Sequence, residues 1–557
     1  MAHEEILAAV DAGRLMDCVR AVCTGERLSN EPEAQAFDVL HKSLEDAGCR
    51  VTRESLPGYV STPEGASFEA GGEAYEVLTH PMTPSVEVLE APLAYVPVDA
   101  VGETAPADVS GRIVLTDGLA MEPVVRALED RGAAGVVFIT GEEIHNMIVS
   151  RVWGSPTPET LHDYVGIPVA SLSFGDGTRL RARLAEAGGT LPARLSTRVE
   201  NRWTEIPVIT AEIRGADEDF VMVTGHVDSW GLGALDNASG NACAVELARI
   251  LAPLASDMRR SVRFVLWSGH SHGRYAGSTA WCDAHFEELE RHCLLNVNAD
   301  CLGGRGATVM TESPAMASTR GLARTALREA AGVTDWRGCR FSRSCDQSFW
   351  GAGVPSIFSQ VSEQPPFEGA AADAFGKMFG SDRTGGFGAW WHTRTDTPDK
   401  LDPENLARDV RVFASVLAHA LFDERLPVDA AAEVLELRDE LKTWQEKAGD
   451  SLDLSEVLAR LDLLAEALEA TARSDDPKRF EKRSRRVLSE IIPLAYVEGS
   501  VYSHDEALRA PPVPMLRLID ELASLSEHER NAALVSLRRA VNRLKASTAR
   551  ALEAARA

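Results

Sequence analysis

Between about residues 206 and 302, the hydrophobic positions form short, nearly unbroken runs separated by glycine-rich turns and amphipathic segments. Three such runs are VMVTG (221–225), VRFVLW (262–267) and LLNVNA (294–299). Runs of this kind indicate strands that are buried on both faces, and the segments at 237–255 and 275–292 have the periodicity of helices. The pattern predicts an α/β fold in which helices cover both faces of a mixed sheet.

Two other stretches of the chain have different patterns. Residues 85–203 contain short β-type runs, such as GRIVLTDG and AAGVVFIT, around one predicted helix at 121–133. After about residue 403 the strands stop, and amphipathic helices with leucines at helical spacing follow. We expect an α/β domain built from 1–84 and 204–425, an inserted domain at 85–203 and a helical domain at 426–557. Three units agree with the length of 557 residues, which is too long for one core.

Composition and charge narrow the classes of partner. The net charge of −27 argues against binding to nucleic acid or to an anionic membrane surface. No apolar window reaches the roughly 20 residues that a membrane span needs, and the first 22 residues do not resemble a secretory signal. The nine cysteines are scattered without a CxxC pair, which is typical of reduced core residues. We therefore expect a cytoplasmic protein without nucleic-acid or membrane partners.

Polar residues follow each of the three predicted strands. His226 and Asp228 come after the first strand, His270 and His272 after the second, and Asp300 after the third. In open α/β sheets, ligands bind beyond the carboxyl ends of the strands. One histidine or aspartate at such a position would be typical of an ordinary turn. Three strand ends with such residues predict a binding site.

Two further residues complete a candidate ligand set. Asp236 lies in GLGALDNASG directly before a predicted helix, and His392 lies in the polar loop WWHTRTDTPDKLD. Imidazole and carboxylate groups together suit zinc or another divalent first-row ion, and a carboxylate such as Asp236 can bridge two ions. Asp228 is well spaced to accept a hydrogen bond from His226 and to orient its imidazole.

Five segments carry a resemblance to a known family. They are GHVDSWGLGALDNASG, FVLWSGHSHGRYAGS, NVNAD, SCDQSFWGAGVPSI and WWHTRTDTPDKLD. Their order and spacing resemble those of the co-catalytic zinc aminopeptidases, in particular the glutamate carboxypeptidase and transferrin receptor branch. Residues 85–203 resemble the protease-associated domain of that branch, and the C-terminal helices more weakly resemble its dimerisation domain. The resemblance implies a homodimeric, zinc-dependent exopeptidase with a phosphorylase/hydrolase-like α/β core.

The resemblance also implies roles for individual residues. His226, Asp300 and the bridging Asp236 would hold one metal ion, and His392 with Asp236 would hold a second. Asp228 would orient the imidazole of His226.

The turn after the second strand departs from the family. Its members carry two adjacent glutamates here, a general base followed by a metal ligand, whereas WSGHSHGRYAGS contains no acidic residue. Counted forward from Trp267, the pair falls on His270 and Ser271; counted back from Gly277, it falls on Ser271 and His272. A third arrangement uses both histidines, one as a ligand and the other as an acid/base near neutral pH. We favour His272 as the ligand and His270 as the acid/base; the alternative is a degenerate site with both histidines on the surface.

Four residues in loops near the site are candidates for binding the substrate. Arg274, Arg343 and Arg394 have the side chain that pairs with a carboxylate through two hydrogen bonds, and Tyr275 is placed to stabilise an oxyanion. Together with these residues, the resemblance implies a metal-dependent hydrolase for an amide or peptide-like bond of a small-molecule or peptide-like substrate. The alternatives are a non-hydrolytic lyase or cyclase on the same fold and a catalytically silent binding protein.

Overall fold

The computed structural model describes residues 3–101, 109–379, 386–474 and 476–557. The strands are β1 (Arg50–Ala70), β2 (Glu73–Tyr75), β3 (Leu78–Thr79), β4 (Val86–Tyr95), β5 (Ile113–Asp117), β6 (Gly135–Ile139), β7 (Val169–Leu172), β8 (Leu191–Ile213), β9 (Phe220–His226), β10 (Ser261–Trp267), β11 (Cys293–Asn298) and β12 (Ser356–Ile357). The helices are α1 (His3–Ala8), α2 (Ala12–Val22), α3 (Glu31–Asp46), α4 (Glu122–Glu129), α5 (Phe174–Glu186), α6 (Ser239–Leu251), α7 (Ala276–Ala284), α8 (Phe286–His292), α9 (Arg320–Ala331), α10 (Ala370–Phe379), α11 (Pro403–Phe422), α12 (Ala430–Ala448), α13 (Ser455–Ser474), α14 (Pro477–Tyr496) and α15 (Glu527–Arg556).

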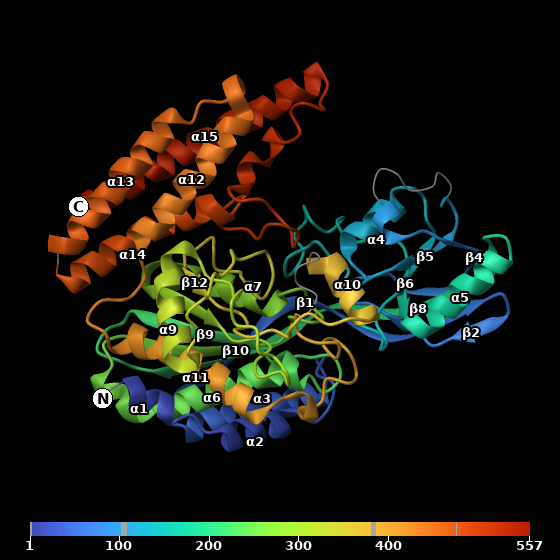
Figure 1. Cartoon of the computed structure of the whole chain (residues 1–557), viewed down its shortest axis with the longest axis horizontal. Coiled ribbons are helices and arrows are strands. Elements are labelled where there is room, and N and C mark those ends of the chain that lie inside the picture. The colour runs from blue at the N-terminus through green and yellow to red at the C-terminus, as the bar shows by residue number, and fades with distance from the viewer. Residues whose placement is uncertain (1–2, 102–108, 380–385, 475) are drawn as a thin grey trace.

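The central sheet has helices on both of its faces, as the apolar runs predict (Figure 1). Its strands β12, β11, β9 and β10 are parallel neighbours, and β8 runs antiparallel to β10. Side chains alternate across the sheet: Val221 and Val223 face the core shared with α2, α3, α6 and α11, whereas Phe220 and Met222 face the core shared with α7 and α8. The segment predicted as one helix at 275–292 forms two, α7 and α8, because the backbone of His285 leaves helical geometry between them.

The long strands β1 and β8 connect the central sheet to a second module (Figure 1). They pair antiparallel from Arg50 opposite Glu212 to Ala70 opposite Ala193. At its far end β8 also pairs with β4, and the sheet continues through β5, β6, β7 and β3. The core of this module takes residues from 68–75 as well as from 93–195. The inserted module therefore shares two continuous strands with the α/β domain.

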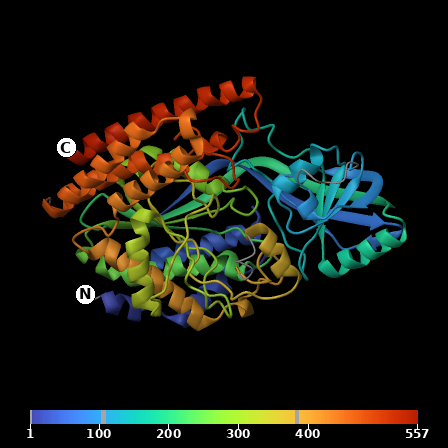
Figure 2. The same cartoon turned by 45° about the horizontal axis from the view of Figure 1, so that its top comes forward.

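The C-terminal helices α12, α13, α14 and α15 pack together as a bundle, and the C-terminal part of the chain lies along one side of the molecule (Figure 2). Helix α12 packs against α13 and α14, and α15 packs against both of these helices. Amphipathic faces supply the core of the bundle, as the leucine spacing predicts. Within the described ranges, the helices are all too short or too polar to cross a bilayer.

Candidate metal centre

The sheet brings the three predicted strand ends to one edge. Strand β9 is parallel to both β10 and β11, with His226 opposite Trp267 and Thr224 opposite Asn298. Because neighbouring parallel strands end on the same side, His226, the turn after Trp267 and the loop after Asn298 meet there. The sequence prediction of a shared strand edge is confirmed.

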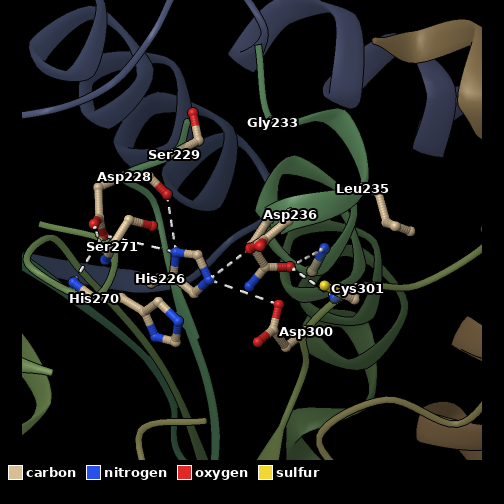
Figure 3. A network of polar contacts seen from close by, with 12 residues as sticks. His226, Asp228, Ser229, Gly233, Leu235, Asp236, His270, Ser271, Asp300 and Cys301 are labelled. Atoms are coloured by element: carbon tan, nitrogen blue, oxygen red, sulfur yellow. Dashed lines mark hydrogen bonds and ion pairs between the residues drawn. The ribbon is translucent and has the colours of Figure 1, made fainter. Parts of the chain in front are cut away.

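The carboxylate of Asp236 lies between two histidines. Its Oδ1 is 3.1 Å from Nε2 of His226, and its Oδ2 is 3.1 Å from Nε2 of His392. Oδ1 of Asp300 lies 3.6 Å from the same nitrogen of His226 (Figure 3). Nε2 of His226, Oδ1 of Asp236 and Oδ1 of Asp300 are all buried, and none has a hydrogen-bond partner among the described residues. The structure thus brings together four of the five residues that were expected to hold metal.

The hydrogen bonds behind the two histidines determine which nitrogen carries the hydrogen. Nδ1 of His226 donates to the main-chain oxygen of Asp228 at 2.9 Å, and Nδ1 of His392 donates to that of Asn146 at 2.8 Å. A carbonyl oxygen only accepts, so in each neutral ring Nε2 has the lone pair. Both lone pairs face oxygens of Asp236, which is an unfavourable arrangement unless a cation lies between them. The donor set of imidazole nitrogens and carboxylate oxygens fits zinc or a similar divalent ion.

The electrostatics of Asp236 also require a positive charge beside it. Burial by itself would raise the pKa of this carboxyl, and positive charge at His226 and His392 would hold its pKa well below the usual range. A metal ion between neutral rings would act in the same direction. Asp396 supports the same loop, because its carboxylate accepts hydrogen bonds from the amides of Leu235 at 2.8 Å and of Asp236 at 3.0 Å. Burial raises the pKa of Asp396 to about 7. Asp396 was not among the predicted site residues, although it lies in the same polar loop as His392.

Arg27 also supports the loop between β9 and Asp236, and sequence reasoning did not find it. Its fully buried guanidinium donates to the main-chain oxygens of Val227 at 2.6 Å, Leu232 at 2.7 Å and Gly233 at 3.2 Å. The backbone of Arg27 also forms an antiparallel bridge with Ser229. A residue from the segment between α2 and α3 therefore holds the loop that leads to the bridging carboxylate.

His270 lies within the ligand group. Its ring stacks on His226, with ring centroids 3.8 Å apart and an angle of 8° between the planes. Nδ1 of His270 donates to Oδ2 of Asp346 at 2.7 Å, and Nε2 has no hydrogen-bond partner in the described part of the chain. His226, His270 and Asp300 each have a potential ligand atom within 4.8 Å of the others. Its position beside the predicted ligands agrees with the count forward from Trp267.

His272 lies elsewhere, which differs from the expectation that it would be a metal ligand. It is fully buried, with Nδ1 3.1 Å from Oδ2 of Asp228 and Nε2 2.7 Å from Oγ of Ser29. Nδ1 donates to the carboxylate, and Nε2 is hydrogen-bonded to the serine hydroxyl. Because protein groups engage both ring nitrogens, His272 connects the turn to the segment before α3 and has no lone pair for an ion.

Asp228 orients its neighbours differently from the expectation. Its carboxylate oxygen Oδ1 is 3.7 Å from Nδ1 of His226, too far for a hydrogen bond. Nδ1 of His226 donates to the main-chain oxygen of Asp228 instead. The carboxylate accepts from the amides of His270 at 3.2 Å and Ser271 at 2.6 Å, and from the ring of His272. Asp228 therefore orients His226 through its backbone and holds the GHSHG turn through its side chain (Figure 3).

The inserted module contributes directly to the site. In addition to accepting from His392 Nδ1, Asn146 donates its amide to the main-chain oxygen of His392 at 2.8 Å. The ring of Trp391 stacks on His392 with centroids 3.5 Å apart. The position of His392, a predicted ligand, thus depends on Asn146 of the inserted module. No local sequence pattern indicates this contact.

The three predicted substrate-binding arginines are engaged with protein groups. Arg274 donates to the main-chain oxygen of Ala507 at 3.0 Å, and Arg343 pairs with Asp505 at 2.9 Å. Arg394 is 71% exposed and pairs with two glutamates. The structure places none of the three guanidinium groups in the ligand group.

Tyr275 lies beside the site. Its buried ring contacts the edge of His270 with centroids 4.9 Å apart and packs on Trp153 at 4.3 Å. Burial raises the pKa of its phenol to about 12. Tyr275 therefore keeps its hydroxyl hydrogen at neutral pH and forms part of the wall next to His270.

Comparison with known proteins finds a family model that matches the part of the chain around this centre. Residues 208–417 match the sequence model of Peptidase family M28. The chain is similar to Aminopeptidase YwaD of Bacillus subtilis, with 24% identity over 359 residues that cover 61% of this chain and 72% of that protein. It is also similar to a Glutamate carboxypeptidase 2 homolog of Caenorhabditis elegans, with 27% identity over 177 residues that cover 30% of this chain and 21% of that protein. The chain therefore spans most of the first relative and a minor part of the second.

Solved structures show a similar fold. A Peptidase M28 precursor from Shewanella amazonensis has a TM-score of 0.57 at 20% identity, covering 74% of this chain and 94% of that chain. BSAP, a zinc aminopeptidase from Bacillus subtilis, has a TM-score of 0.54 at 18% identity, covering 75% and 98% of the two chains. An aminopeptidase from Aneurinibacillus sp. strain AM-1 has a TM-score of 0.54 at 20% identity, covering 75% and 96%. These likenesses confirm the predicted α/β fold.

Proposed function

We propose that this protein, whose residues 208–417 match Peptidase family M28, is a zinc-dependent hydrolase of an amide or peptide bond in a small substrate. One observation carries the proposal: the two oxygens of Asp236 face unprotonated Nε2 atoms of His226 and His392, both at 3.1 Å. The names of similar proteins, an aminopeptidase and a zinc aminopeptidase, support this metal and this reaction class.

The donor count supports one firmly held ion. His226, Asp236 and Asp300 provide three protein ligands for a first ion, which is the usual number in catalytic zinc sites. A second ion would have Asp236 and His392, with Ser271 at the position of the family's ligand glutamate. A serine hydroxyl is a much weaker zinc ligand than a carboxylate. We therefore infer that the second ion is held weakly.

The residues around the centre would transfer protons and hold the ligands in position. A zinc ion held there would supply a Lewis acid that polarises a carbonyl oxygen. Asp346 holds the Nδ1 hydrogen of His270, so Nε2 of that ring can take a proton and return it to a leaving amine. Asp228 keeps His270 beside His226 by accepting from its amide. Asn146 keeps Nε2 of His392 directed at Asp236.

The test compares two carboxylate variants. Asp236→Asn keeps the size of the side chain but removes a ligand oxygen, and it should lose zinc and hydrolysis of an aminoacyl anilide and dipeptide panel. Asp409→Asn is the matched control, because Asp409 is a buried carboxylate that accepts from Gly303 and Ser362. Asp409→Asn should keep both its zinc and its hydrolytic activity.

Two results would contradict the proposal. Hydrolysis that survives the loss of zinc would remove the metal from the mechanism. Wild-type protein that holds zinc but cleaves no amide in the panel would favour the non-hydrolytic alternative.

A further inference from the structure

A second group of metal-ligating side chains lies between α1 and the end of α11. His3, His419 and Asp423 each have a potential ligand atom within 4.8 Å of the others. The three side chains are 17–37% exposed, so the group is half-buried and open to ions from solution. None of these residues belongs to the centre around Asp236.

The helices determine the geometry of this group. His419 and Asp423 are four residues apart at the C-terminal end of α11, so their side chains project on the same side. His3 comes from the first turn of α1, which packs on α11 through the buried side chain of Ile6. Oδ2 of Asp423 is 2.7 Å from Nδ1 of His419, and Oδ1 is 3.2 Å from Nε2 of His3. The carboxylate therefore lies between two imidazoles, as Asp236 does in the first centre.

Glu329 of α9 lies behind His419. Its Oε2 is 3.1 Å from Nε2 of His419, and the same oxygen accepts from Oγ of Ser415 at 2.8 Å. A carboxylate that accepts from the distal nitrogen of an imidazole holds that nitrogen protonated and leaves the other one free to ligate. For His419, the other nitrogen is Nδ1, which lies 2.7 Å from Oδ2 of Asp423, so a bound ion would replace the hydrogen between these two atoms.

We propose that His3, His419 and Asp423 bind a divalent ion of the zinc type, with Glu329 orienting His419. Two imidazoles and a carboxylate are a common zinc ligand set, and water can complete the coordination. The bound ion would join the first turn of α1 to the end of α11 and would be structural. This proposal is independent of the function proposed for the centre around Asp236.

The ions can be counted by native mass spectrometry of the untagged full chain after equilibration with Zn²⁺. His3→Gln is the key variant, because it leaves the bonds of His419 to Asp423 and Glu329 in place. We expect it to carry one zinc ion fewer than wild type and to keep the ion held by Asp236. Asp236→Asn should show the reverse, retaining the ion at His3. His292→Gln is the matched control, since it removes a histidine that pairs with Asp219 outside any such group among the described residues.

A second measurement uses a variant that keeps all three ligands. Glu329→Gln should weaken zinc binding at this site about 10- to 100-fold by removing the acceptor behind His419. Zinc should also raise the melting temperature of Asp236→Asn protein, and adding His3→Gln should abolish that increase. Equal zinc counts in wild type and His3→Gln, or an unchanged increase after adding His3→Gln, would overturn the proposal.

Discussion

The imidazoles of His226 and His270 stack face to face, with centroids 3.8 Å apart and planes 8° from parallel. The lone pairs of stacked rings lie in two parallel planes, so one ion cannot lie in the planes of both rings. His226 faces the carboxylates of Asp236 and Asp300, whereas His270 is held from behind by Asp346. The stack therefore supports the proposed division between His226 as a metal ligand and His270 as an acid/base.

The role of His270 can be tested by its removal. We expect His270→Gln to keep its zinc and to lose about 10²- to 10⁴-fold in kcat, the usual contribution of a general acid/base. Asp346→Asn should lower kcat less, because the ring remains but its Nδ1 hydrogen is held less firmly. Zinc content and steady-state kinetics of the same preparations give the answer. Loss of zinc from His270→Gln would instead make His270 a ligand.

Arg27 should affect both stability and metal binding. A lysine ammonium cannot reproduce the three hydrogen bonds to the main-chain oxygens of Val227, Leu232 and Gly233, and each oxygen that Arg27→Lys leaves without a donor should cost roughly 1–3 kcal/mol. The loop before Asp236 then loosens, so zinc affinity should also fall. Urea unfolding and zinc titration measure the two effects. Arg20→Lys is the control, because Arg20 is exposed and pairs only with Asp17 among the described residues. Unchanged zinc affinity in a destabilised Arg27→Lys protein would mean that the loop keeps its shape without the guanidinium.

Ser29 and His272 should affect stability without affecting metal content. Ser29→Ala leaves Nε2 of the buried His272 without a partner and should cost roughly 1–3 kcal/mol of unfolding free energy. Ser29 has a φ of 54°, so Ser29→Gly should be less destabilising because glycine adopts this conformation without strain. Chemical denaturation ranks the variants, and metal analysis checks them. A zinc deficit in Ser29→Ala would show that the turn positions ligands through His272.

The inserted module should lose stability in acid. Burial lowers the pKa of His80 to about 3, and its Nδ1 accepts from the amide of Met147 while Nε2 bonds Ser171 Oγ. Between pH 3 and 6.5 the unfolded chain therefore binds a proton that the folded state does not. Stability then falls with decreasing pH by up to roughly 1.4 kcal/mol per pH unit. Urea unfolding between pH 4.5 and 7.5 should show this slope, and His80→Gln should reduce it. Equal slopes in both proteins would assign the acid sensitivity to other groups.

The sequence predicted the parts of the site that depend on local order along the chain. An apolar run that ends in a polar residue places that residue at a strand end, so His226, Asp300 and the turn carrying His270 were found at one sheet edge. Asp236 and His392 were found from their loop motifs. The sequence did not decide between the two alignments of the GHSHG turn with the family's glutamate pair. The turn has one extra residue, which can lie either before or after the pair.

The hydrophobic pattern by itself determined the α/β class of the fold, and the motifs determined which residues are expected to hold metal. Only the tertiary structure decided which histidine of the turn enters the site, because that depends on Asp228, Asp346 and Ser29, which come from three separate segments. It also decided that Arg27 and Asn146 support the ligands, through main-chain atoms. Contacts to main-chain atoms over such sequence separations leave no periodicity or motif, since any residue provides the same carbonyl oxygen.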